Sequence, residues 1–189
     1  MFRLTEPIQT SRLLLRPFVE GDLDELYAIQ SMPEITRFLY WNVRSRDEVR
    51  AVLQQRLQLD RLAAKGDVLV LAAVRADTGR LIGDVNLRWI SEQHRQGEFG
   101  FVLHPDHHGH GFGTEAASAV LDLAFGPVGL HRVIGRTDGR NTASAALMRR
   151  LGLRQEAHFV QNEIFKGEWG DELVFAILAE EWAERPASS

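Results

Sequence analysis

The sequence predicts an α/β fold in which helices pack on a mixed β-sheet. Segments with the two-residue period of strands alternate with segments that have the helical period, and no repeat or long linker interrupts them. The 189 residues suit one domain, and 44% hydrophobic residues are enough for its core. We therefore expect a single domain over residues 1–184 and a loose tail over residues 185–189.

Seven segments have the character of strands. Residues 68–74 form a continuous apolar run, as expected of a strand buried on both faces. In the next segment, Val85, Leu87 and Trp89 alternate with polar residues, and the turn Lys166-Gly167 separates the last two segments. The expected strands are residues 11–19, 68–74, a segment that contains 84–89, 97–103, 132–137, 154–164 and 171–178.

Four helices follow from capping residues and the helical period. Asp22 and Ser45 can each cap a helix, a third helix begins at Thr114, and a fourth covers residues 142–151. The apolar residues of the last two helices that we expect to face the core are Ala117, Val120, Leu121 and Ala124, and then Ala143, Ala146, Leu147 and Leu151.

The composition argues against several classes of function. A formal net charge of -4 gives no basic patch for nucleic acid or an anionic membrane. No apolar run reaches the ~20 residues of a membrane span, and the N-terminus lacks the zones of a signal peptide, so we expect a cytoplasmic protein. The chain has no cysteine, which excludes disulfides, thiolate metal sites and a cysteine acyl-enzyme.

A glycine-rich segment, residues 108–115, joins a predicted strand to a predicted helix. Backbone N–H groups and the helix dipole favour an anion at such a turn, and alternating glycines at 109, 111 and 113 let the backbone approach it. The segment lacks the Gly-Lys-Ser/Thr ending of a P-loop and the glycine spacing of the dinucleotide fingerprint. The sequence therefore predicts a site for a different phosphate-bearing cofactor.

Residues 108–113, His-Gly-His-Gly-Phe-Gly, resemble the acyl-CoA pyrophosphate loop of the GCN5-related N-acetyltransferase (GNAT) family, Gln/Arg-x-x-Gly-x-Gly/Ala. His108 stands where Gln or Arg is usual. Further blocks resemble the RimJ/RimL-like branch of ribosomal-protein N-terminal acetyltransferases, in the same order: residues 10–17, 81–87, 141–144 with 151–153, and 169–172 through 181–182. The resemblance implies a central, mostly antiparallel mixed sheet of about seven strands, splayed between strands 4 and 5 around the cofactor.

The resemblance also implies an activity. Acetyl-CoA would donate an acetyl group directly to a primary amine in a ternary complex, without a metal, and a protein N-terminus is the leading acceptor. The alternatives are a small amine such as an antibiotic or polyamine, another acyl group such as succinyl, a non-catalytic acyl-CoA-binding module, and a domain without a ligand. A monomer and a homodimer are both open.

The cofactor residues are those that match the family's motifs. Asn141 would hold the pantetheine arm of the cofactor, although it is an equally good helix N-cap. Backbone N–H groups of the fourth strand would meet the oxyanion where the sheet splays. The complete predicted set is Phe101, Val102, Leu103, His108, Gly109, His110, Gly111, Phe112, Gly113, Thr114, Asn141 and Ser144.

Two residues are candidates for catalysis. Glu98 lies on the strand face opposite Phe99 and is our candidate for the general base; the alternative is a solvated glutamate. Ser144 shares a helix face with Asn141 and Met148, and its hydroxyl would donate to the leaving thiolate. Many GNAT enzymes have a tyrosine acid at the position of Met148, and methionine cannot replace it.

The acceptor side is less defined. Trp41, Arg44, Trp89, Glu98 and the turn at residues 163–169 are candidates, and the aromatic residues could equally belong to the core. Four histidines at positions 104, 107, 108 and 110 have no metal-site spacing, so we expect no metal there. Some of them would flank the phosphates, and protonated His108 or His110 would add positive charge at low pH.

Overall fold

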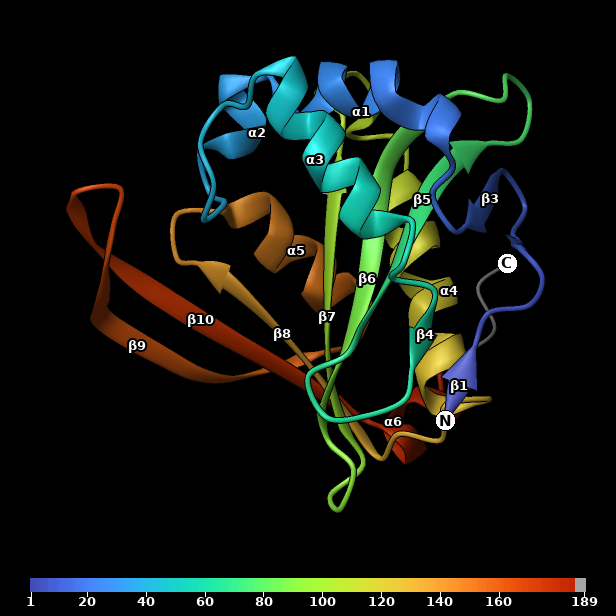
Figure 1. Cartoon of the computed structure of the whole chain (residues 1–189). Helices are drawn as coiled ribbons and strands as arrows, with labels where there is room; N and C mark the ends of the chain where they lie inside the picture. The colour runs from blue at the N-terminus through green and yellow to red at the C-terminus, as the bar shows by residue number, and fades with distance from the viewer. Residues whose placement is uncertain (186–189) are drawn as a thin grey trace.

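Eight strands form one mixed sheet in the computed structural model, which describes residues 1–185 (Figure 1). All neighbouring pairs are antiparallel except β7 and β8. In spatial order the strands are β2 (Ile8–Gln9), β3 (Leu13–Arg16), β5 (Val68–Arg75), β6 (Leu81–Ser91), β7 (Gln96–Leu103), β8 (Arg132–Asp138), β10 (Glu168–Leu178) and β9 (Arg154–Phe165). The short strands β1 (Phe2–Arg3) and β4 (Arg61–Leu62) pair separately.

The sheet opens between β7 and β8. These strands pair only at Gln96–Arg132, Gly97–Val133 and Glu98–Ile134. Beyond Glu98, β7 stays paired with β6 as far as Leu103, while β8 follows β10 as far as Asp138. The expected splay between the fourth and fifth long strands is therefore confirmed.

Helices cover both faces of the sheet (Figure 1). On one face, α1 (Leu23–Gln30), α2 (Pro33–Thr36) and α3 (Arg46–Arg56) pack with β5. On the other, α4 (Phe112–Phe125) and α5 (Thr142–Arg150) pack on the larger core cluster, and α6 (Ala179–Ala183) follows β10. Alternate residues of β5 enter the two clusters, so the apolar run is buried on both faces as predicted.

The predicted helix starts had different outcomes. Ser45 caps α3 as expected: it accepts from the Glu48 N–H, and the Glu48 carboxylate accepts from the Ser45 N–H at 2.7 Å. Asp22 makes no side-chain cap for α1, because its buried carboxylate instead binds the Arg16 guanidinium and the Val19 N–H. The α4 helix starts at Phe112, two residues before the predicted Thr114.

Short elements account for most of the other differences. The strand expected over residues 11–19 contains only Leu13–Arg16, because Pro17 has no N–H to donate and the chain then enters the 3₁₀ turn η1 (Glu20–Asp22). Five short elements, β1, β2, α2, β4 and α6, were not predicted from the sequence. Of the predicted loose tail, Arg185 stacks over the Trp182 ring at 4.1 Å, and residues 186–189 lie outside the described part.

Among residues 1–185, none of the helices has the length and apolar character needed to cross a bilayer.

Candidate functional site

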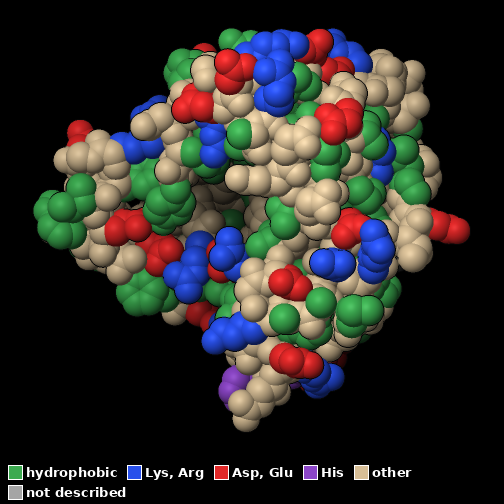
Figure 2. Space-filling view, viewed as in Figure 1, with side chains coloured by type: hydrophobic (Ala, Val, Ile, Leu, Met, Phe, Trp, Pro, Cys, Tyr) green, Lys and Arg blue, Asp and Glu red, His purple; other side chains and the backbone are tan. Residues whose placement is uncertain are grey.

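A cavity of about 1350 Å³ extends from the glycine-rich loop to the opening between β7 and β8. Its wall includes the end of β7, the loop before α4, one side of α5, residues 8–12 and residues 34–39 around α2. Figure 2 shows the molecule hollowed between the α2–α3 region and the projecting β9–β10 arm. Ten of the twelve predicted cofactor residues line the cavity: Phe101, Val102, Leu103, His108, Gly109, Gly111, Gly113, Thr114, Asn141 and Ser144.

The loop has the backbone geometry of an anion site. Gly109 and Gly111 have φ of +76° and +82°, which favours glycine, and Gly111 is the N-cap of α4. The first N–H groups of α4 have no intrahelical acceptor and point out of the helix end. A Cβ at Gly111 would lie 3.2 Å from the Arg12 Nη2 atom, so a side chain would crowd the space beside the loop.

His110 and Phe112 do not line this cavity. Phe112 is buried, 7% exposed, and its ring packs against the guanidinium of Arg12 at 4.6 Å. These two residues therefore support the loop. The His110 carbonyl accepts a hydrogen bond from Arg12 Nη1 at 2.9 Å.

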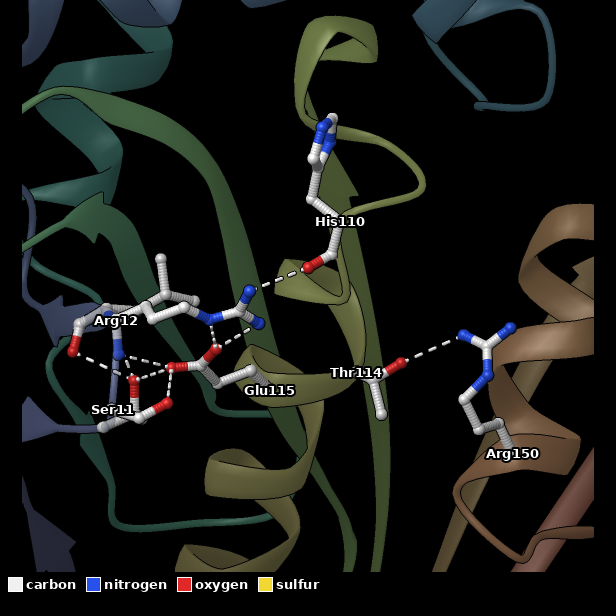
Figure 3. Close-up of polar contacts among 8 residues, drawn as sticks. Ser11, Arg12, His110, Thr114, Glu115 and Arg150 are labelled. Atoms are coloured by element: carbon white, nitrogen blue, oxygen red, sulfur yellow. Dashed lines mark hydrogen bonds and ion pairs between the residues drawn. The ribbon is translucent and has the colours of Figure 1, made fainter. Parts of the chain in front are cut away.

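Glu115 fixes the N-terminal segment against the start of α4 (Figure 3). Its carboxylate accepts from the hydroxyls of Thr10 and Ser11 and from the backbone N–H and Nε of Arg12 at 2.6–3.0 Å. Burial raises the pKa of Glu115, but these hydrogen bonds outweigh it and hold the pKa below its usual value. An ionised Glu115 next to an anion site is thus neutralised by Arg12.

The α5 helix presents small and polar residues to the cavity. Asn141 is the N-cap, its side-chain oxygen accepts from the Ser144 N–H at 3.1 Å, and both residues line the cavity. Ala143 and Ala146, predicted to face the core, are exposed and line the cavity instead. Met148 does not line it: Met148 is 2% exposed and occupies the space left by Gly135, which lacks a side chain.

Phe101, Val102 and Leu103 lie on β7 beyond the last pair with β8. The cavity reaches this part of β7, so its backbone is accessible to a ligand on the side where β8 has turned away. A ring nitrogen of His108 donates to the Leu103 carbonyl at 3.0 Å, which ties the loop to the end of this strand.

Glu98 is the last residue of β7 that pairs with β8, and it does not line the cavity. Its side chain is 32% exposed and lies 3.8 Å from the Arg136 Nε atom. Arg136 also pairs with the buried Glu172 at 3.2 Å, and Asn162 donates to the same Glu172 carboxylate. Glu98 is thus part of a polar group on the sheet face opposite the Phe99 side chain, as predicted.

The predicted acceptor residues separate into three places. Trp89 is 9% exposed and belongs to the main core cluster, so it is withdrawn as an acceptor residue. Trp41 lies between α2 and α3, with the Arg44 guanidinium over its ring at 4.4 Å, and it does not line the cavity. The 163–169 turn borders a second hollow of about 590 Å³ through Phe165, Lys166 and Glu168.

The histidines serve the loop in different ways. Burial, then His104 and Arg75, lower the pKa of His107, which lines the cavity, so it carries less charge than an ordinary histidine at a given pH. His104 caps the 3₁₀ turn η2 (Pro105–His107) by accepting from the Asp106 N–H. In the described part of the chain, no three His, Asp or Glu side chains come together as a metal site requires.

The cavity residues that were not predicted from the sequence include Arg12 and Arg150. Arg12 belongs to a block that carried the family resemblance, but its partner Glu115 is 103 residues away, and sequence spacing gives no sign of that pair. Arg150 was predictable in principle, because it follows Ala143 and Ala146 at helical spacing on the same side of α5.

Comparisons with known proteins identify the class. The acetyltransferase (GNAT) domain family matches residues 12–154. This chain belongs to that family, and its large mixed sheet with flanking helices is the fold of its structural neighbours. It is therefore an N-acetyltransferase.

Two relatives and two crystal structures illustrate the relationship. The uncharacterized N-acetyltransferase YnaD of Bacillus subtilis is 30% identical over 93% of this chain and 98% of its own. A crystal structure of a GNAT-family acetyltransferase from Bacillus anthracis has a TM-score of 0.81 at 26% identity, covering 92% of this chain and 99% of that one. Spermidine N(1)-acetyltransferase of Vibrio cholerae is 26% identical over 93% of this chain and 98% of its own. A crystal structure of spermidine N-acetyltransferase from Vibrio cholerae, in complex with CoA and spermine, has a TM-score of 0.78 at 24% identity, covering 93% of this chain and all of that one.

Proposed function

We propose that this enzyme transfers an acetyl group from acetyl-CoA to a primary amine by direct transfer in a ternary complex. The observation that carries the proposal is that the anion-binding loop and the opening between β7 and β8 belong to one cavity. The open helix end suits a pyrophosphate, and the side chain of Asn141 reaches the same cavity near the opening. A Vibrio cholerae relative binds CoA, which supports the same cofactor here.

The residues of this chain then have distinct roles. Acetyl-CoA, when bound, supplies its acetyl group as a thioester. Glu98 accepts the proton of the amine, directly or through water, and backbone N–H groups of Phe101 to Leu103 donate to the carbonyl oxygen of the acetyl group. The Ser144 hydroxyl donates to the departing thiolate. Met148 is buried in the core and takes no part in the reaction, so no general acid acts from this position.

The leading acceptor is a protein or peptide N-terminus, as in the RimJ/RimL-like branch whose blocks the sequence resembles. A polyamine is a second candidate, because the relatives include spermidine N(1)-acetyltransferases. The polar group near the sheet opening also suits a cation, because it contains two carboxylates, Glu98 and Glu172, and one guanidinium, that of Arg136. The cytoplasmic location and the monomeric or dimeric state stay predictions.

The experiment that tests the proposal measures free thiol released from acetyl-CoA in the presence of a panel of amines. The panel contains peptides with varied N-termini, spermidine, spermine and aminoglycosides, and succinyl-CoA serves as an alternative donor. Release with peptides alone supports the leading acceptor, and release with polyamines alone supports the second. If CoA binds but neither donor is consumed with any amine, the chain is a binding module and the proposal is wrong.

Glu98→Gln tests the assigned base. We expect kcat to fall about 100-fold or more, the usual contribution of general base catalysis. The KM for acetyl-CoA should change little, because Glu98 lies outside the cofactor cavity. Glu92→Gln, at an exposed turn between β6 and β7, is the matched control. Unchanged turnover in the Glu98 variant would remove this residue from the mechanism.

A further inference from the structure

The cavity side of α5 ends at Arg150. Asn141, at the other end of the helix, borders the opening of the sheet. The two residues are nine positions apart, which corresponds to about 13 Å along a helix. Between them the wall contains Ala143 and Ala146, whose small side chains leave room for a flat group.

Arg150 reaches from α5 to the start of α4. Its Nη1 atom donates to the Thr114 hydroxyl at 3.1 Å, and Figure 3 shows Arg150 and Arg12 approaching α4 from opposite sides. Both arginines line the cavity, as does Arg37 at the end of α2, away from the α4–α5 side, but the charges of Arg12 and Arg150 differ in availability. Arg12 is paired with the Glu115 carboxylate at 2.7 Å, whereas within residues 1–185 no carboxylate forms an ion pair with Arg150.

We propose that Arg150 binds the 3′-phosphate on the ribose of CoA and so distinguishes CoA from 3′-dephospho-CoA. This inference rests on the proposed function. If the loop holds the pyrophosphate and Asn141 holds the pantetheine arm, the nucleotide must extend from the loop in the direction away from Asn141. The cavity wall includes Ser118 of α4 and Ala146 and Arg150 of α5, which offers that space.

The chemistry favours Arg150 over Arg12 for this phosphate. A guanidinium forms paired, charge-assisted hydrogen bonds with a phosphate, and the uncompensated charge of Arg150 is available for them. On the Arg12 side the same phosphate would approach the ionised Glu115, which repels it. The 3′-phosphate is therefore expected on the α5 side of the loop.

The test compares the Kd values of CoA and 3′-dephospho-CoA by isothermal titration calorimetry. For the unaltered enzyme we expect CoA to bind about 10-fold more tightly, a difference typical of a charge-assisted contact. Arg150→Gln should reduce this ratio to about 1–2 by weakening only CoA, and Arg150→Lys should restore part of it as a point charge. Arg149→Gln is the matched control, because Arg149 does not line the cavity, donates to Gln155 and stacks over Phe175.

Three results would overturn the inference: equal binding of both ligands by the unaltered enzyme, an undiminished ratio in Arg150→Gln, or equal weakening of both ligands in that variant. The last result would place Arg150 on the pyrophosphate or on the loop. Melting temperatures of all variants show whether the fold is retained. If the unaltered enzyme binds neither ligand, it is the proposed function that fails.

Discussion

Gly111 shows how one residue can meet two requirements of the cofactor site. Its φ of +82° lies in the left-handed region, and the position of its missing side chain is 3.2 Å from Arg12. Gly111→Val should raise the Kd of CoA about 10-fold or more, because a valine held in this conformation costs about 1–3 kcal/mol and also crowds the loop. Calorimetric titration with CoA measures the effect.

Gly129→Val is the control for this variant. Gly129 also has a positive φ, +72°, but it lies in the turn after α4, where no atom would be near a Cβ. This control should lose stability without losing CoA affinity. Near-normal CoA binding by Gly111→Val would contradict the assignment of the loop.

The loop glycines and Met148 differ in how far their roles could be predicted from the sequence. The glycines of the loop were readable because their spacing has a direct backbone meaning. The role of Met148 could not be predicted in this way. Residues 141, 144 and 148 share a helix face in projection, but the Met148 side chain is buried in the core, in the space beside Gly135 of β8. A helical projection does not include the neighbouring strand.

At the scale of elements, the β9–β10 hairpin holds the α2 region in place. The Lys166 ammonium donates to the Thr36 carbonyl at 2.6 Å and to the Trp41 carbonyl at 3.2 Å. Tyr40 donates to Glu163 at 2.5 Å from the same region. These contacts join the hairpin tip to the segment that walls the cofactor cavity, so the two elements are expected to move together.

Lys166→Met should release this segment. We expect faster amide hydrogen exchange over residues 36–41 with little change in melting temperature, because few buried apolar contacts are lost. The other lysine of the chain, Lys65, is exposed, so Lys65→Met is the matched control. Unchanged exchange over residues 36–41 in the Lys166 variant would show that Tyr40 and the aromatic contacts suffice.

Glu156 makes the pairing of the C-terminal strands sensitive to acid. Hydrogen bonds from Arg132 on β8 and Arg154 on β9 lower its pKa to about 2. Because the pKa is lower in the folded than in the unfolded chain, the stabilisation is complete above about pH 5 and is lost as the pH falls towards 2. The side chain is 30% exposed, so we expect about 1–2 kcal/mol after screening.

Glu156→Gln should therefore lower the free energy of unfolding at pH 7. Near pH 2 the free energies of unfolding of the variant and of the unaltered protein should approach each other. Urea unfolding over this pH range measures the difference. A gap that stays constant with pH would mean that the glutamine fails for steric reasons and that the carboxylate charge contributes little.

The elements themselves were predicted unequally. Long strands with a clear period were found, since alternation reports directly which face is buried. The α2 helix was missed because it has only four residues, from Pro33 to Thr36, too few for the helical period to register. Yet α2 and the residues after it wall the cavity, so the least predictable element contributes to the site.

At the scale of the whole molecule, the sheet consists of two halves joined by few strand contacts. The β7–β8 seam has three residue pairs, whereas β7 pairs with β6 at eight positions. The halves are otherwise connected through the core cluster beneath α4 and α5. The cavity is lined by the end of β7 on one side and by α5, which follows β8, on the other, so a bound ligand would lie between the two halves.

This arrangement predicts that CoA stabilises the entire domain. At 100 times its Kd, a ligand that binds only the folded state adds about 2.7 kcal/mol, which corresponds to a rise of about 5–10 °C in Tm for a chain of this size. Hydrogen exchange should slow in residues 99–103 of β7 and in residues 135–138 of β8 alike, because the ligand bridges the opening. With its Kd raised about 10-fold, Gly111→Val should gain only about half of this stabilisation at the same CoA concentration. Protection confined to the loop at residues 104–114 would mean that CoA binds by its phosphates alone, and the pantetheine arm would then lie outside the opening of the sheet.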